Sequence, residues 1–252
     1  MDQLNGYILE MKKVAISQSN YIPWRGYFDL INSVDEFILY DDMQYTRRDW
    51  RNRNKIKTSQ GVKWLTVPVQ VKGKFEQKIK DTLLDGHDWQ QTHFKTLQQF
   101  YKSSQYFDEV LELLSPLYCD NTYTSLSHMN FSFLAKICQY LNINTKITHS
   151  MDYQLVEGKS ERLVSICQQS GANEYISGPS AKNYMDTELF EASNISVTWF
   201  DYSGYINYPQ LWGAFVSEVS ILDLLFNCGP TSSNYLSKNN VTKPLGLSGG
   251  VV

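Results

Sequence analysis

Three clusters of polar and aromatic residues in this sequence can bind a charged ligand, and each follows a predicted strand. The first cluster lies in the loop after residues 14–16 and consists of Gln18, Asn20, Tyr21, Trp24 and Tyr27. Carboxamide, phenol and indole groups donate hydrogen bonds, and the helix predicted to follow offers free N–H groups and the positive end of its dipole. The loop therefore suits a phosphate or a carboxylate. The alternative is a capped turn whose aromatic rings hold the helix in place.

The second cluster is a basic segment that follows the predicted strand at residues 37–40. Its candidate ligand-binding residues are Asp41, Gln44, Tyr45, Arg48, Trp50, Asn52, Arg53, Asn54 and Lys57. Guanidinium and ammonium groups bind phosphates and carboxylates, and Trp50 can stack on a base or a sugar. The segment is too short, and the remaining chain too acidic, for a nucleic-acid groove. A solvated charged surface is the alternative interpretation.

The third cluster is the turn after the predicted strand at residues 174–177. Its candidate anion-binding residues are Ser177, Gly178 and Ser180, with Lys182 close by in the sequence. Small residues at such a turn bind an anion through hydroxyl and backbone N–H groups. The alternative is a structural joint in which Ser180 caps the next helix.

Candidate catalytic groups are few. Asp41 and His93 are the residues we consider as proton acceptors, and Tyr27 is a third candidate that can hydrogen-bond to a phosphate. A structural role is the alternative for His93, because its predicted helix is apolar around it. His87 and His93 are six residues apart and do not share a helix face, so we predict no metal site.

The order of predicted elements indicates an α/β fold with a mainly parallel, Rossmann-like sheet. Apolar runs predict strands at residues 14–16, 37–40, 62–71, 144–148, 174–177 and 197–200. Helical spacing predicts helices at residues 89–114 with a break at 103–104, and at 125–141, 160–171 (with Gly171 as the C-cap), 184–192 and 220–227. We expect one α/β domain over residues 12–230 with a helical region at about 89–141. Residues 1–11 are expected to form an N-terminal extension and residues 231–252 a flexible polar tail.

Composition limits the class of protein. The 252 residues have a formal net charge of -3, which argues against nucleic acid as a partner. Four scattered cysteines, no signal-like N-terminus and no long apolar run favour a cytoplasmic protein without a membrane span. Aromatic residues make up 14% of the chain, which indicates either a ligand cleft or a tyrosine-rich core.

The first loop resembles that of nucleotidyltransferases with a His-x-Gly-His motif after their first strand. Trp24-Arg25-Gly26-Tyr27 has a glycine at the same relative position, whereas Trp24 and Tyr27 replace the two histidines. The turn at Ser177 loosely resembles the triphosphate-binding loop of the same enzymes. The likeness implies a nucleotidyltransferase-like fold, but indole and phenol groups cannot supply the positive charge that the histidines provide.

The chain as a whole resembles the WbqC-like family. The residues that carry the likeness are Gln18, Pro23, Trp24, residues 26–28, Asp41, Gln44, Tyr45, Trp50, residues 52–54, residues 56–57 and residues 64–69, with downstream matches at 160–163, 175–179, 208–210 and 220–229. The resemblance implies a bacterial protein of O-antigen, lipopolysaccharide or other surface-polysaccharide biosynthesis. Nucleotide-linked sugars, often with an amino group, are the substrates of that context.

From these features we expect a transferase that adds an acyl or aminoacyl group to the amine of a nucleotide-linked sugar. One alternative is a nucleotidylyltransferase-like activating enzyme, and only this alternative calls for magnesium. The other is a protein that binds a sugar or nucleotide without catalysis. The expected partner is a nucleotide sugar or another phosphorylated small molecule, and the expected co-substrate is a nucleotide or an acyl donor.

Overall fold

The computed structural model describes residues 11–236, which form two compact units. The sheet unit consists of residues 11–17, 30–40 and 145–201. The helix–hairpin unit consists of residues 18–29, 41–144 and 202–236. Each unit is thus built from three separate stretches of chain.

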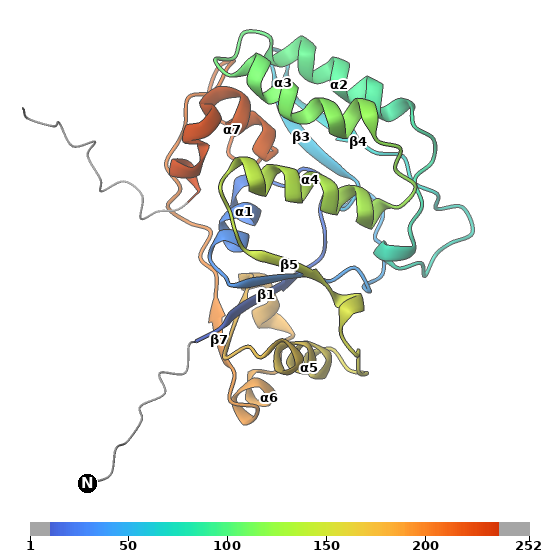
Figure 1. The fold of residues 1–252 in the computed structure, drawn as a ribbon, viewed down its shortest axis with the longest axis vertical. Coiled ribbons are helices and arrows are strands. Elements are labelled where there is room, and N and C mark those ends of the chain that lie inside the picture. The colour runs from blue at the N-terminus through green and yellow to red at the C-terminus, as the bar shows by residue number, and fades with distance from the viewer. Residues whose placement is uncertain (1–10, 237–252) are drawn as a thin grey trace, which may run out of the picture. The chain divides into compact units, whose positions relative to one another are not determined.

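A five-stranded parallel sheet forms the sheet unit (Figure 1). Its strands, in spatial order, are β5 (Lys146–His149), β2 (Glu36–Leu39), β1 (Lys13–Ser17), β6 (Glu174–Ser177) and β7 (Ser196–Trp199). Val14 of the central strand lies opposite Glu36 on one side and Tyr175 on the other. The expected α/β class with a mainly parallel, Rossmann-like sheet is confirmed.

Two helices cover this sheet, α5 (Ser160–Ser170) and α6 (Thr187–Ala192). Side chains from β1, β2 and β6 pack against both helices in one apolar core that includes Val14, Ile38 and Phe190. Gly171 ends α5 with a left-handed φ of 73°, as the sequence predicts for a C-cap. Helix α6 begins later than the predicted residue 184, because the Asp186 side chain caps it by accepting a hydrogen bond from the Glu188 N–H.

The helix–hairpin unit contains most of the helices. They are α2 (Asp88–Tyr101), α3 (Phe107–Ser115), α4 (Leu126–Tyr140) and α7 (Ile221–Cys228), with a π-helical turn η2 (Pro116–Asp120) between α3 and α4. Figure 1 shows α2 and α3 in green and α7 in red. The break that the sequence predicts at residues 103–104 separates α2 from α3. Helix α1 (Arg25–Asn32) begins in this unit and ends in the sheet unit.

An antiparallel hairpin of β3 (Arg53–Thr58) and β4 (Gly61–Thr66) completes the helix–hairpin unit. The sequence predicts β4 but assigns no strand to the basic run that forms β3. Asn54 and Ile56 are buried whereas Arg53 and Lys55 are half-exposed, so residues 53–56 follow the usual two-residue period, and Lys57 and Thr58 are buried as well. The polar buried residue hides that period in the sequence.

Short 3-10 helices connect several elements. They are η1 (Ile79–Asp81), η3 (Ser150–Asp152), η4 (Pro179–Asn183) and η5 (Gly229–Tyr235). Residues 231–236, assigned to the polar tail from sequence, include part of η5 together with buried Ser232 and Leu236. Residues 1–10 of the N-terminal extension and 237–252 of the tail lie outside the described residues.

Candidate functional site

The structure brings the first two sequence clusters together within the helix–hairpin unit. The Arg51 guanidinium donates hydrogen bonds to the Gln18 and Asn20 side-chain oxygens. The Asn54 amide donates to the carbonyl oxygens of Tyr21 at 3.2 Å and Ile22 at 2.9 Å. The first loop is therefore held directly against the start of the hairpin.

Arg51 is a site residue that sequence reasoning missed. Besides contacting Gln18 and Asn20, its guanidinium lies 3.7 Å from the Asp49 carboxylate. The backbone carbonyl oxygen of Arg51 accepts a hydrogen bond of 2.9 Å from the Asn130 side-chain amide. The same amide donates to the Ser19 hydroxyl at 3.0 Å. Five arginines and lysines lie within six residues of Arg51 in the sequence, and only the fold shows which side chain reaches the loop.

Asp41 lies under the same loop and is fully buried. One carboxylate oxygen accepts a hydrogen bond of 2.8 Å from the Ser19 N–H, and the other accepts one from the Ser127 hydroxyl. The carboxylate thus fixes the loop backbone to α4. Its burial makes Asp41 a positioning residue for the loop in this geometry.

His93 is buried among aromatic rings on α2. Its Nδ1 lies 2.9 Å from the Tyr21 hydroxyl, which in turn lies 2.6 Å from the Tyr118 hydroxyl. Burial lowers the pKa of His93 to about 4, and a hydrogen bond with the Thr66 backbone only partly opposes this. The imidazole is therefore neutral at physiological pH, and the aromatic excess of the sequence is in part a tyrosine-rich core.

Tyr27 and several residues of the second cluster also make internal hydrogen bonds. The Tyr27 hydroxyl donates to the Gln18 carbonyl oxygen at 2.8 Å, and burial raises the pKa of Tyr27 well above its usual value. The Tyr45 hydroxyl donates to the Asn52 side-chain oxygen at 3.0 Å, and the Asn52 amide donates to the Val67 carbonyl. The Gln44 amide donates to the Phe75 carbonyl oxygen at 2.8 Å. These contacts hold loops together.

Trp50 and Arg53 of the second cluster form an aromatic and cationic face on the hairpin together with Lys55 and Trp64, which are not among the residues selected from the sequence. The two indole rings lie 5.4 Å apart and are about 40% exposed. The Arg53 guanidinium lies 4.0 Å from the Trp64 ring centre, and the Lys55 ammonium lies 5.5 Å and 5.3 Å from the two rings. Arg53 also donates to the carbonyl oxygen of exposed Arg48. This hairpin face combines stacking surface with positive charge.

The third cluster lies in the sheet unit. Ser177 ends β6 and is buried, and its carbonyl oxygen accepts a hydrogen bond of 2.8 Å from the Phe200 N–H. Gly178 is the N-cap of η4, and no side-chain hydrogen bond caps that turn. The alternative that Ser180 caps a helix is therefore wrong. Ser180 is exposed.

Gly26 is required by the packing of the first loop. A Cβ atom at this position would overlap the Trp24 ring, which also contacts the rings of Tyr202 and Tyr205. The tight approach explains the glycine in the Trp-x-Gly-Tyr sequence without reference to a histidine motif.

Replacing Gly26 by alanine is expected to lower the free energy of unfolding by about 1–3 kcal/mol, the usual cost of overpacking. Chemical denaturation of the variant measures this change. A matched Gly73→Ala variant, where a Cβ meets no atom within 4 Å, controls for loss of a glycine, although its φ of 73° adds local strain. Stability equal to the wild type in Gly26→Ala would contradict the packing argument.

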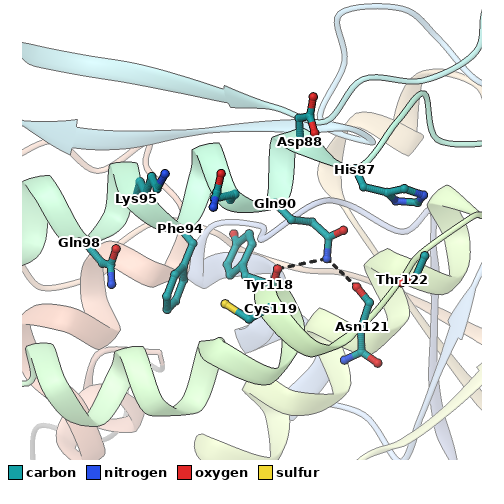
Figure 2. A pocket seen from close by; sticks show the side chains of 11 residues that line it. His87, Asp88, Gln90, Phe94, Lys95, Gln98, Tyr118, Cys119, Asn121 and Thr122 are labelled. Atoms are coloured by element: carbon teal, nitrogen blue, oxygen red, sulfur yellow. Dashed lines mark hydrogen bonds between the residues drawn. The ribbon is translucent and has the colours of Figure 1, made fainter.

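A separate cavity of about 540 Å³ lies between α2 and the π-helical turn η2 (Figure 2). The buried Gln90 amide donates to the carbonyl oxygens of Asn121 at 2.8 Å and Tyr118 at 3.3 Å, as the dashed lines show. Gln90 thereby satisfies carbonyl groups that the π-turn leaves without a helical partner. None of the predicted ligand-binding residues lines this cavity.

The described residues were compared with the requirements of a metal site and of a membrane span. Residues 11–236 hold no group of three or more His, Cys, Asp or Glu side chains that could coordinate a metal ion. No helix within the same residues is long and apolar enough to cross a bilayer. All four cysteines are unbridged, and Cys119 alone among them is exposed.

The model of the WbqC-like protein family matches residues 18–235 of this chain. This chain belongs to the WbqC-like family. A protein of Mycobacterium tuberculosis described as uncharacterized is 59% identical over 226 residues, which cover 90% of this chain and 98% of that protein. No solved structure matches this WbqC-like chain. The family expected from the sequence motifs is therefore confirmed, and the matched region begins at Gln18 of the first cluster.

Proposed function

We propose that this protein binds a nucleotide-linked amino sugar during assembly of a bacterial surface polysaccharide and transfers an acyl or aminoacyl group to the sugar amine. Membership of the WbqC-like family supports the polysaccharide context. The hairpin face carries the proposal for the substrate. Its two half-exposed indole rings can stack on a base or a sugar, and Arg53 and Lys55 can neutralise a diphosphate.

The proposed transfer forms one bond and breaks one. The sugar amine attacks the carbonyl carbon of the donor, the leaving group departs with the bonding electron pair, and the amine proton passes to the leaving group or to water. Asp41 and His93 are buried, so the proposal gives both the role of holding the first loop and the aromatic core in place. Gln18, Asn20 and Arg51 would present the loop to the substrate.

Titration with uridine- and thymidine-diphosphate amino sugars tests the substrate class. We expect binding by calorimetry and a higher melting temperature of the protein, because a ligand that binds only the native state stabilises it. Trp50→Ala and Trp64→Ala should each weaken binding about tenfold, since stacking of a base contributes about 1–3 kcal/mol. Phe75→Ala removes another exposed aromatic ring of the same unit and should bind normally.

Two further readouts separate the alternatives. Mass spectrometry of the sugar after incubation with acyl donors detects the transferred group, and binding without turnover under any donor would favour a non-catalytic protein. Pyrophosphate release from a nucleoside triphosphate would favour nucleotidylyl transfer. Wild-type affinity in both tryptophan variants would contradict the assignment of the hairpin face.

A further inference from the structure

A cavity of about 420 Å³ lies between the tip of the hairpin and the loop at residues 212–216, within the helix–hairpin unit. Lys57 lines it, although only 4% of this residue is exposed. Buried lysines are rare unless they are paired with an acid, because removing an ammonium group from water is costly. Lys57 is therefore the unusual feature of this cavity.

No carboxylate pairs directly with the Lys57 ammonium. Among residues 11–236, no Asp or Glu oxygen lies within 4 Å of its Nζ. Its hydrogen bonds go to the Gln210 side-chain oxygen at 3.0 Å and the Ala214 carbonyl oxygen at 2.6 Å. An ammonium group has three donors. The third has no acceptor in the described part of the chain.

The carboxylate of Asp223 is hydrogen-bonded to groups other than Lys57. Asp223 accepts hydrogen bonds from the Tyr101 hydroxyl at 2.8 Å, the Tyr208 hydroxyl at 2.9 Å and the Gln210 amide at 2.7 Å. Gln210 thus stands between the carboxylate and Lys57. Burial raises the pKa of Asp223, and the positive charge of Lys57 is among the influences that oppose this, so the two groups attract each other through space. No hydrogen bond joins them in the described residues, and the third N–H of the ammonium is left for another acceptor.

The loop on the other side of the cavity contains backbone N–H groups that have no acceptor among the described residues. Trp212 and Gly213 have successive positive φ angles of 66° and 60°, which turn the backbone sharply. Within residues 11–236 the N–H groups of residues 212–215 donate no hydrogen bond. Successive backbone N–H groups in a tight turn are common partners of anions. Ser59 is also among the residues that line the cavity.

We propose that the Lys57 cavity binds a small oxyanion, a carboxylate or a phosphate group, which accepts the third N–H of Lys57 and adds a direct counter-charge to that of Asp223. The ring of Trp212, 39% exposed, lines the same cavity and offers an apolar surface to the body of the ligand. In the transfer reaction this oxyanion belongs to the acyl donor, an assignment that rests on the proposed function. Binding of the isolated anion does not depend on it.

Calorimetry and thermal unfolding with phosphate, pyrophosphate, acetate and succinate, against chloride at equal ionic strength, test the site. At least one oxyanion is expected to raise the melting temperature of the wild-type protein. Comparison of the phosphate and pyrophosphate titrations with those of acetate and succinate shows whether the site binds phosphates or carboxylates. Lys57→Met should weaken that binding at least tenfold, because a charge-assisted hydrogen bond is lost. Lys72→Met removes an exposed lysine of the same unit and should leave binding unchanged.

Lys57→Met should also remain folded in chloride with a lower melting temperature than the wild type, since methionine fills a similar volume while Gln210 and Ala214 lose a donor. The anion response of each variant is therefore compared with its own melting temperature in chloride. The proposal is overturned if no oxyanion stabilises the wild type beyond chloride, or if Lys57→Met responds as the wild type does. Equal losses in Lys57→Met and Lys72→Met would likewise overturn it. The Trp50→Ala and Trp64→Ala variants keep the anion response, so a failure of nucleotide-sugar binding is distinguishable from a failure of this site.

Discussion

Replacing Asp223 by alanine is expected to lower the free energy of unfolding by about 3–5 kcal/mol, the usual effect of removing one partner from a buried charged network. The carboxylate is 1% exposed and accepts three hydrogen bonds, from Tyr101, Tyr208 and Gln210. Without it, two buried hydroxyls and an amide lose their acceptor. Urea denaturation of the wild type and the variant measures the difference.

A double-mutant cycle separates this network from simple loss of volume. The double variant Asp223→Ala, Tyr101→Phe should be less destabilised than the sum of the single variants, because removing both partners leaves no unpaired hydroxyl at that bond. Asp120→Ala removes an exposed acid and should change stability by less than about 0.5 kcal/mol. Additive losses across the cycle would show that Asp223 and Tyr101 are not coupled.

Acidification to about pH 2 is expected to remove about 3 kcal/mol of stability through Glu36 alone, on the relation of 1.36 kcal/mol per pKa unit. Its side chain is 1% exposed and accepts hydrogen bonds from Lys12 at 2.7 Å, Tyr153 at 2.6 Å and Thr148 at 2.8 Å. Burial on its own raises the pKa of Glu36. The hydrogen bonds from Lys12, Tyr153, Thr148 and Lys146 outweigh it and lower that pKa from 4.5 to about 2.

The sign follows from the direction of that shift. Because the pKa of Glu36 is lower in the folded protein, its contribution is fully present above about pH 4.5 and is lost as the pH falls through about 2. Denaturation series between pH 6 and pH 2 should show a steeper loss for the wild type than for Glu36→Gln. Glu157→Gln, at an exposed position, should keep the wild-type slope. Parallel curves for the wild type and Glu36→Gln would contradict the assignment.

The parallel sheet was predictable because its strands are short apolar runs. The core run around Val14 and the run that starts at Phe37 are buried on both faces, which gives the continuous hydrophobic pattern of a parallel sheet. The alternation with helices then indicates the α/β class. Strand β3 was not predicted, because the sequence pattern relies on apolar residues at buried positions. Asn54 is buried instead through the hydrogen bonds of its side-chain amide.

The candidate site residues remain a prediction, and their contacts could not be predicted from the sequence. Motif spacing indicated the first loop and the basic segment that contains β3, but not the hairpin. It could not show that His93 is enclosed by Tyr21 and Tyr118, because that environment is assembled from residues far apart in the chain. The role of Arg51 was not predicted for the same reason. A helix and a strand separate it in the sequence from its partners Gln18 and Asn20. The type of a side chain determines which reactions it can take part in, and its burial determines whether a ligand can reach it.

The interleaving of the two units has a consequence for how the chain reaches its native state. Strand β1 pairs with β2, which is close in the sequence, and with the distant strand β6, where Glu174 lies opposite Lys13. One edge of the central strand therefore depends on a contact between residues far apart in the chain, and such contacts slow folding. No cut between residues 18 and 201 releases an intact unit, so limited proteolysis and truncation cannot dissect this protein.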